Sequence, residues 1–175
     1  SVLDYPHKRD SVGKPLPGMQ VRIDNPDADG VGGIHLTGPM VMTGYIGKEP
    51  IDGDLNTDDI GYVDEDGFVY ILNRRKDLII SGGENIYPKE LEDLVYTLPA
   101  VKECAVVPVP DPKWGQVPAL FVVFHDGESM TGDAILSFMT KSLAKYKVPK
   151  YVKILPALPR NGTGKIVRNE LHLED

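Results

Sequence analysis

Cysteine is almost absent from this sequence of 175 residues, since Cys104 is the only one. A single cysteine cannot form a disulfide within the chain, so we expect a protein of a reducing compartment. The neighbours Ala105 to Val107 are apolar, which favours a buried core thiol over a nucleophile. With only four histidines beside this cysteine, no zinc-site spacing occurs, and we expect no metal ligands in this chain.

Positive charge is also scarce. Nineteen Lys and Arg stand against twenty-six Asp and Glu, a net charge of −7. Nucleic-acid-binding domains are usually basic, so we expect no nucleic-acid partner. No apolar run approaches the ~18 residues of a membrane span, and no basic-then-apolar leader opens the sequence. These absences predict a soluble, cytoplasmic protein.

The acidic residues are unevenly placed along the chain. Residues 1–75 hold seven Lys and Arg against thirteen Asp and Glu, whereas residues 76–175 hold twelve against thirteen. This shift favours a boundary near Arg75. We therefore expect two regions, 1–75 and 76–175.

Residues 1–73 have the pattern of strands and turns, with no convincing helix. Short apolar runs predict strands over Gln20 to Ile23, Gly33 to Thr37, Met40 to Tyr45, Gly61 to Val63 and Phe68 to Leu72. The acidic turn Asp64 to Gly67 is of the kind that closes a hairpin. The predicted fold of this region is all-β, part of a barrel.

After Arg75 the pattern becomes mixed. Pro88 suits the first turn of a helix, and apolar residues then recur at i, i+3, i+4 and i+7. Thr131 is a candidate N-cap of a second helix. Strands are predicted over Val101 to Val109, Pro118 to Phe124 and Tyr151 to Leu155. This order predicts a small α+β domain, a sheet covered by helices.

Gly162-Thr163-Gly164-Lys165 looks like the end of a phosphate-binding Walker loop. That motif needs a glycine where Pro159 stands and a Ser or Thr where Ile166 stands. We therefore exclude this interpretation.

Three polar groups remain. The first is Asp59 with Arg74: a carboxylate and a guanidinium together suit a ribose diol, although Asp59 is equally suited to cap a turn. The second is the pair Gly82-Gly83, which is either an ordinary turn or a place where a ligand approaches the backbone closely. The third is the flexible loop that ends in Lys165, by itself a common kind of surface loop.

Taken together, these groups resemble a known family. The run from Asn73 to Pro88, preceded by Asp59 and followed by Gly164-Lys165, closely resembles the adenylate-forming superfamily in motif order and spacing. That superfamily includes acyl-CoA synthetases, luciferases and peptide-synthetase adenylation domains. The similarity runs from about Ser11 to Leu171.

The resemblance implies a reaction in two steps. ATP, with Mg²⁺, first activates a carboxylic acid to an acyl-adenylate; the C-terminal lid domain then rotates, and the thiol of CoA attacks. Asp59 and Arg74 are similar to the residues that bind the ATP ribose, and Lys76 lies at the family's hinge. Lys165 resembles the catalytic lysine, whose ammonium stabilises charge on the carboxylate and α-phosphate.

Further residues match positions that contact CoA in the family. Gly82 and Gly83 fit the loop that lines the pantetheine tunnel, and Trp114 and Tyr146 match positions that hold the CoA adenine in some ligases. A basic run beside Tyr146, including Lys147 and Lys150, suits CoA phosphates, although a solvated face would look the same.

The sequence departs from the family in several places. Asp58 stands where the family usually has glycine, and Val148 replaces a basic residue that some relatives use on CoA phosphate. The phosphate loop, most of the Mg²⁺ site and the acid pocket lie upstream in the family and are missing here. The chain is therefore expected to need the missing large domain as its partner and to be inactive alone.

Three stretches look most like 2-succinylbenzoate–CoA ligases of menaquinone synthesis, with medium- or long-chain fatty-acid–CoA ligases as the alternative. They are Ile79 to Pro88, Lys113 to Pro118 and Leu143 to Lys150. From another class, a non-catalytic module that binds CoA or a partner stays open. An intact Lys165 speaks against that module, which would not need an adenylation lysine.

Overall fold

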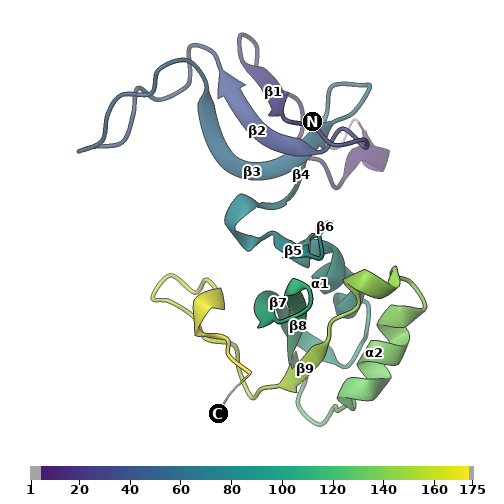
Figure 1. The fold of residues 1–175 in the computed structure, drawn as a ribbon. Coiled ribbons are helices and arrows are strands. Elements are labelled where there is room, and N and C mark those ends of the chain that lie inside the picture. The colour runs from purple at the N-terminus through teal and green to yellow at the C-terminus, as the bar shows by residue number, and fades with distance from the viewer. Residues whose placement is uncertain (1–4, 174–175) are drawn as a thin grey trace. The chain divides into compact units, whose positions relative to one another are not determined.

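In the computed structural model, which describes residues 5–173, the chain separates into two compact units, Ser1–Lys76 and Asp77–Asp175. The first unit is built on one antiparallel sheet in the order β1-β2-β3-β4 (Figure 1). Its strands are β1 Gln20–Asp24, β2 Gly32–Thr37, β3 Leu55–Val63 and β4 Val69–Arg74. The sheet is open, because β1 and β4 are its two edges.

The predicted hairpin turn joins β3 to β4. Asp64 and Phe68 are hydrogen-bonded across it through their backbones, and the Asp64 side chain accepts a second bond from the Phe68 N–H. Lys8, which ends a short 3-10 turn over Pro6–Lys8, donates to the same carboxylate at 2.6 Å. The local turn chemistry therefore fixes the pairing of β3 with β4.

One predicted strand is wrong. Residues 40–45 belong to the long irregular loop between β2 and β3 rather than to the sheet (Figure 1). Gly38 and Gly44 adopt φ of 134° and 153°, outside the range of a normal strand, and Pro39 follows the first of them without an N–H to donate. Met40 to Met42 form a short apolar run that favours a strand, but the glycines and the proline prevent pairing.

The second unit is mixed α and β, as predicted. Five strands form its sheet: β5 Ile79–Ser81, β6 Glu84–Ile86, β7 Val101–Asp111, β8 Gly115–Phe124 and β9 Tyr151–Ile154. β7 and β8 form a long antiparallel hairpin, and β9 pairs in parallel with β8. The short hairpin β5–β6, which turns at Gly82-Gly83, was not predicted as strands.

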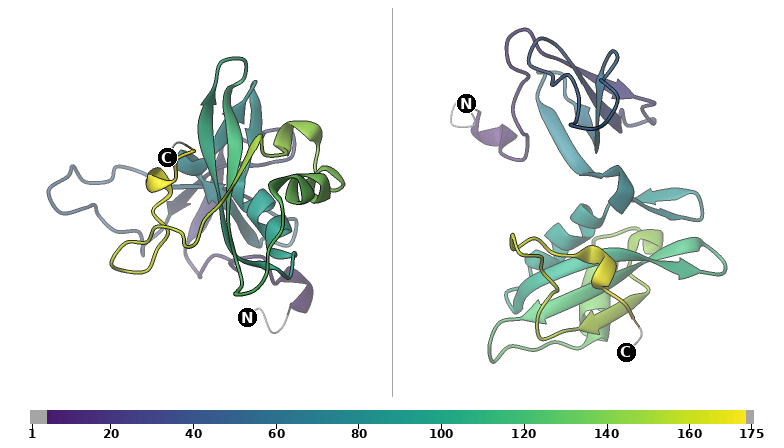
Figure 2. Two further views of the ribbon diagram at one scale, coloured as in Figure 1. Left: turned by 90° about the horizontal axis from the view of Figure 1, so that it is seen from below. Right: turned by 90° about the vertical axis from the view of Figure 1, so that its left-hand side faces the viewer.

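Both predicted helices are present, α1 Pro88–Tyr96 and α2 Gly132–Thr140. Proline occupies the first turn of α1, and the Thr131 side chain caps α2 by accepting from the Ala134 N–H. Both helices lie on one face of the sheet, while the C-terminal segment after β9 covers the other (Figure 2).

Each face of this sheet has its own core. The helix side buries a cluster that includes Ile79, Leu91, Leu120, Ile135 and Met139. The opposite side buries Phe121 together with Leu158 and Leu171 of the C-terminal segment. The sheet therefore lies between two apolar layers, only one of which was expected from the sequence.

The single cysteine lies in this core, as predicted. Cys104 is 2% exposed, and burial raises the pKa of its thiol to about 12. A thiol of that pKa is protonated at neutral pH and is a poor nucleophile. Cys104 is a packing residue.

Candidate functional site

Asp59 and Arg74 lie directly opposite each other on β3 and β4. The Arg74 Nε is 2.7 Å from Asp59 Oδ1, and the Asp59 side chain is only 15% exposed. Between residues 5 and 173 no donor is bonded to the other oxygen, Oδ2. The sheet register thus brings these two predicted residues together and leaves one carboxylate oxygen able to accept from a ligand.

The backbone just before Asp59 is bent. Asp58 has φ of 59°, the left-handed region that favours glycine. Thr57 holds the bend, because its hydroxyl donates to the Ile34 carbonyl and accepts from the Asp59 N–H. The position where the resemblance leads one to expect glycine is therefore one where glycine would be less strained than Asp58.

In the second unit, Gly82 lies against the ring of Trp114. The Gly82 N–H donates to the Trp114 carbonyl at 2.9 Å. A Cβ at Gly82, which has φ of 60°, would lie 2.7 Å from the indole atom Cε3, so no larger residue fits without moving the ring. The Trp114 residue is nevertheless 47% exposed, and therefore part of the ring remains open to a ligand.

Lys150 does not project freely into solvent as the predicted phosphate ligand would. Its ammonium lies 2.6 Å from Asp111 Oδ2, a carboxylate whose side chain is 2% exposed. The other oxygen of Asp111 accepts from the N–H groups of Lys113 and Trp114. Lys150 and these N–H groups lower the pKa of Asp111 to about 2, and Asp111 in turn raises the pKa of Lys150.

Tyr146 and Lys147 lie on a 3-10 turn, Lys145–Lys147. The Lys147 ammonium binds Glu90 of α1 at 2.8 Å, whereas Tyr146 is 44% exposed. In the part of the chain that the structure describes, no ring contact joins Tyr146 to Trp114. The structure therefore does not combine the two aromatic residues into one clamp.

Lys165 lies at the end of a loop organised by Asn161. The Asn161 Oδ1 accepts from the N–H groups of Thr163 and Lys165 and from the Thr163 hydroxyl. Arg160 holds the base of this loop through Glu103 of β7 at 2.8 Å. The Lys165 residue is exposed, and its ammonium has no partner among residues 5–173.

A buried ion pair, which was not predicted from the sequence, fixes the segment after this loop. Arg168 binds both carboxylate oxygens of Glu92, at 2.6 and 3.1 Å, and also donates to the Val106 carbonyl. Glu92 is only 9% exposed and accepts from the Val106 N–H as well. The one indication in the sequence was the position of Glu92. It follows Leu91 and precedes Val95 by about one turn, so that an acidic residue lies on the apolar side of α1.

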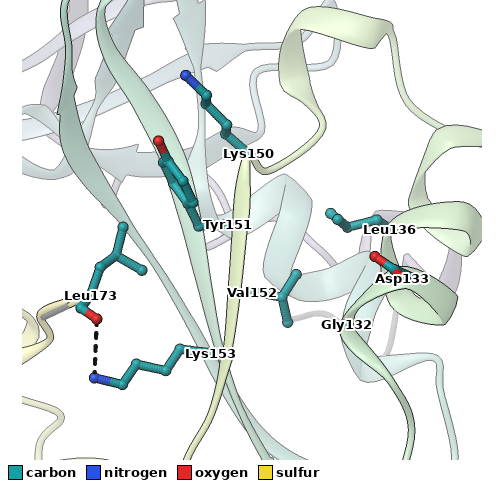
Figure 3. A pocket seen from close by; sticks show the side chains of 8 residues that line it. All are labelled: Gly132, Asp133, Leu136, Lys150, Tyr151, Val152, Lys153 and Leu173. Carbon is teal, nitrogen blue, oxygen red and sulfur yellow. Dashed lines mark hydrogen bonds between the residues drawn. The ribbon is translucent and has the colours of Figure 1, made fainter. Parts of the chain in front are cut away.

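A hollow of about 470 Å³ lies between α2 and β9 (Figure 3). It is lined by Gly132, Asp133, Leu136, Lys150, Tyr151, Val152, Lys153 and Leu173. Lys150 is the only predicted site residue in this lining, and its ammonium is bound to Asp111. Figure 3 shows Lys153 held by the Leu173 carbonyl. The hollow thus does not gather the predicted groups.

The described residues thus hold three polar groups, each within one unit: Asp59 with Arg74, Gly82 with Trp114, and the loop of Lys165. Residues 90–165 match the family AMP-binding enzyme C-terminal domain. That match includes Trp114, Tyr146 and Lys165. Residues 90–165 therefore belong to the family of AMP-binding enzyme C-terminal domains.

Several of the proteins that this chain resembles are CoA ligases. The 2-succinylbenzoate–CoA ligase of Lactococcus lactis is 54% identical over 171 residues, which cover 98% of this chain and 37% of the relative. The structure of the o-succinylbenzoate CoA synthetase of Bacillus subtilis, in complex with its acyl-adenylate intermediate, is 39% identical with a TM-score of 0.86, covering 97% of this chain and 37% of that one. A fatty acyl CoA synthetase of Mycobacterium tuberculosis is 34% identical with a TM-score of 0.66, covering 92% and 34%.

The chain spans little more than a third of the length of these relatives. Over residues 5–173, no helix has the length and apolar character needed to cross a membrane. The same residues contain no cluster of three or more His, Cys, Asp or Glu side chains that could hold a metal.

Proposed function

We propose that this chain is the C-terminal part of an AMP-forming acid–CoA ligase that acts on 2-succinylbenzoate. The 54% identity to a 2-succinylbenzoate–CoA ligase over nearly the whole chain is the observation that carries this proposal. The fatty acyl CoA synthetase is less similar in sequence, 34% identical against 54% and 39% for the two succinylbenzoate enzymes, so a fatty-acid–CoA ligase is the second candidate.

In the first half-reaction the acid carboxylate attacks the α-phosphorus of ATP and releases pyrophosphate. Asp59 accepts hydrogen bonds from the ribose hydroxyls, because its Oδ2 is unpaired and Arg74 keeps the carboxylate oriented. Lys165 brings its ammonium to the attacking carboxylate and the α-phosphate, where negative charge is greatest. Its unpaired, exposed position on an ordered loop supports this role.

In the second half-reaction the thiol of CoA attacks the acyl-adenylate and AMP leaves. Gly82 and Gly83 let the pantetheine arm pass close to the backbone, and the open part of the Trp114 ring offers a face for stacking. Tyr146 is similarly exposed, while the ammonium groups of Lys147 and Lys150 are already paired with Glu90 and Asp111, which weakens their attraction for a phosphate.

The two half-reactions need different positions of residues 76–175, the lid. We place the hinge at Lys76, an exposed residue in the 3-10 turn Arg75–Asp77 where the two units divide. A few backbone dihedral changes at such an element end are enough for a domain rotation. The division of the chain at this turn supports the assignment.

The test uses the full-length enzyme that carries this chain. Lys165→Ala should slow adenylate formation, followed as acid-dependent ATP–pyrophosphate exchange, by about 10²–10³-fold, the loss expected for one preorganised charge contact. Thioester formation from pre-made adenylate should change much less. Lys102→Ala is the matched control, because Lys102 is an exposed lysine on β7 outside the predicted site.

Three outcomes would contradict the proposal. Equal losses in both half-reactions would exclude the role of Lys165. If the wild-type enzyme prefers fatty acids to 2-succinylbenzoate, the chain is part of a fatty-acid–CoA ligase instead. Turnover by the isolated 175-residue chain would refute its dependence on the large domain.

A further inference from the structure

The turn between β7 and β8 is built on one buried carboxylate. Asp111 receives three donors: the N–H groups of Lys113 and Trp114 on Oδ1, at 2.9 and 3.0 Å, and the Lys150 ammonium on Oδ2 at 2.6 Å. With its side chain 2% exposed and its pKa near 2, this group is a fully ionised buried acid at neutral pH. Lys150 is the only side-chain cation bonded to it among residues 5–173.

This turn positions the residue that packs on the glycine pair. The N–H of Trp114 is bound to Asp111, and its carbonyl receives the N–H of Gly82. The two bonds fix both sides of the Trp114 backbone. The ring then lies so close to Gly82 that a Cβ there would approach Cε3 to 2.7 Å. A shift of the turn would therefore move the indole over the glycine pair.

We propose that Asp111 is a positioning residue for the CoA step, fixing Trp114 over Gly82, and that Lys150 acts through Asp111 rather than as a ligand of CoA phosphate. This inference rests on the proposed CoA ligase function. It replaces the sequence-based role of Lys150 with a different one, because the Lys150 ammonium is already paired with the buried Asp111 carboxylate, which offsets the charge that a phosphate would meet.

The critical variant is Asp111→Asn, which keeps the size of the side chain. The amide oxygen still accepts from the two N–H groups, but the amide nitrogen then faces the Lys150 ammonium, a donor against a donor. The turn loses its pairing with Lys150, and the indole is held less firmly. In the full-length enzyme we expect kcat/KM for CoA to fall about tenfold or more, because small misplacements of a positioning group have effects of that size.

Adenylate formation by Asp111→Asn should stay within about twofold of the wild-type rate, because the loop of Lys165 makes no contact with Asp111. Asp126→Asn, an exposed acid at the end of the same β-hairpin, is the matched control and should change neither half-reaction. Unchanged CoA kinetics in Asp111→Asn, or an equal loss in both half-reactions, would overturn the positioning role.

A double-mutant cycle separates the two roles of Lys150. If Lys150 acts through Asp111, the double variant Asp111→Asn with Lys150→Met should lose no more kcat/KM for CoA than the worse single variant. Losses that multiply would show that Lys150 binds CoA independently and would overturn that part of the inference.

The 175-residue chain offers a readout that does not depend on turnover. Trp114 is its only tryptophan, so its fluorescence reports on this turn alone. Acrylamide should quench it more strongly in Asp111→Asn than in wild type or in Asp126→Asn, and equal quenching would overturn the inference. If the full-length enzyme makes no acyl-CoA, the proposed function fails, whereas the quenching result still decides whether Asp111 fixes Trp114.

Discussion

The two units of this chain are held together in different ways. The C-terminal unit buries apolar side chains on both faces of its sheet, among them Leu120 and Phe121 with no exposure on opposite sides. Among its described residues, 5–76, the N-terminal unit buries only four large apolar side chains, those of Ile34, Ile60, Phe68 and Val69. Its loop between β2 and β3 instead exposes large apolar residues, including Tyr45 at 61% and Ile46 at 106%. Apolar burial supplies most of the free energy of folding, so the two units differ in intrinsic stability.

This difference in burial agrees with the roles proposed for the two units, a rotating lid and the last part of a larger domain. A lid that rotates must stay folded in both of its positions, which requires a complete core of its own. The N-terminal unit is proposed to be the last part of a larger domain, where its remaining apolar surface would be covered. Exposed apolar residues of this kind are typical of surfaces that contact another part of a protein.

The largest expected effect comes from separating the units. Residues 77–175 expressed alone should fold and melt cooperatively, within a few degrees of the corresponding transition in the whole chain, as seen by Trp114 fluorescence. Residues 1–76 alone should lack a cooperative transition in circular dichroism, because four buried apolar residues leave too small a core. A cooperative melt of residues 1–76 would contradict this comparison.

The next effect tests the polar contact between α1 and the C-terminal segment. Arg168→Met leaves the Glu92 carboxylate buried without its guanidinium, which should lower the free energy of unfolding of the C-terminal unit by about 3 kcal/mol. The measurement is urea unfolding of the whole chain followed by Trp114 fluorescence. Lys89→Met is the matched control: it breaks the exposed ion pair with Asp93 on the same helix and should cost less than about 0.5 kcal/mol. Similar losses in the two variants would mean that Glu92 is hydrated.

Each unit contains one carboxylate whose pKa is lowered to about 2. Lys8 holds the pKa of Asp64 near 2 in the N-terminal unit, and Lys150 holds that of Asp111 near 2 in the C-terminal unit, against an ordinary value of 3.8. A carboxyl group whose pKa is lower in the folded than in the unfolded protein stabilises the fold at pH values above its unfolded pKa. This stabilisation is lost as the pH falls from about 4 through about 2. Both units should lose stability over that range.

The two contributions can be separated by variants. Asp64→Asn should flatten the acid dependence only in the N-terminal unit, measured by hydrogen exchange of β3 and β4 amides at matched intrinsic rates. Asp111→Asn should flatten it only in the C-terminal unit, measured by Trp114 fluorescence in urea. A variant that changes the acid response of the other unit would show that the units do not unfold independently.

The sequence predicted the C-terminal unit better than the N-terminal one, for physical reasons. Pro88 and Thr131 indicate where the two helices begin, because proline suits the first turn of a helix and threonine caps it. The long apolar runs of β7 and β8 are typical of buried strands. The hairpin β5–β6 was missed because three-residue strands carry almost no periodic signal. The false strand over residues 40–45 arose because Met40 to Met42 form a short apolar run, but Gly38, Pro39 and Gly44 prevent pairing.

For the candidate site, the sequence and its family resemblance named the groups and paired Asp59 with Arg74, but they did not indicate the other contacts. The contact of Asp59 with Arg74 follows from a strand register, and that of Gly82 with Trp114 from a pairing between distant strands. The roles of Asp111 and Arg168 depend on contacts 39 and 76 residues away, with Lys150 and Glu92. Local sequence patterns do not indicate contacts between residues so far apart along the chain. The spacing from Asp111 to Trp114 is, however, typical of a turn capped by an aspartate.

The smallest expected effect concerns Asp58 in the less stable unit. Its φ of 59° costs a residue with a Cβ about 1 kcal/mol, whereas glycine adopts it freely. The side chain is exposed and accepts no hydrogen bond within residues 5–173, so little is lost on its removal. Greater freedom of glycine in the unfolded chain offsets part of the gain. Asp58→Gly should therefore stabilise the N-terminal unit by about 0.5 kcal/mol and slow hydrogen exchange of β3 amides about twofold. Asp29→Gly, the same change in the same unit at an exposed position with negative φ, should do the opposite. Faster exchange in both variants would mean that the bend at Asp58 is not strained, and that the lower stability of this unit comes from its small core alone.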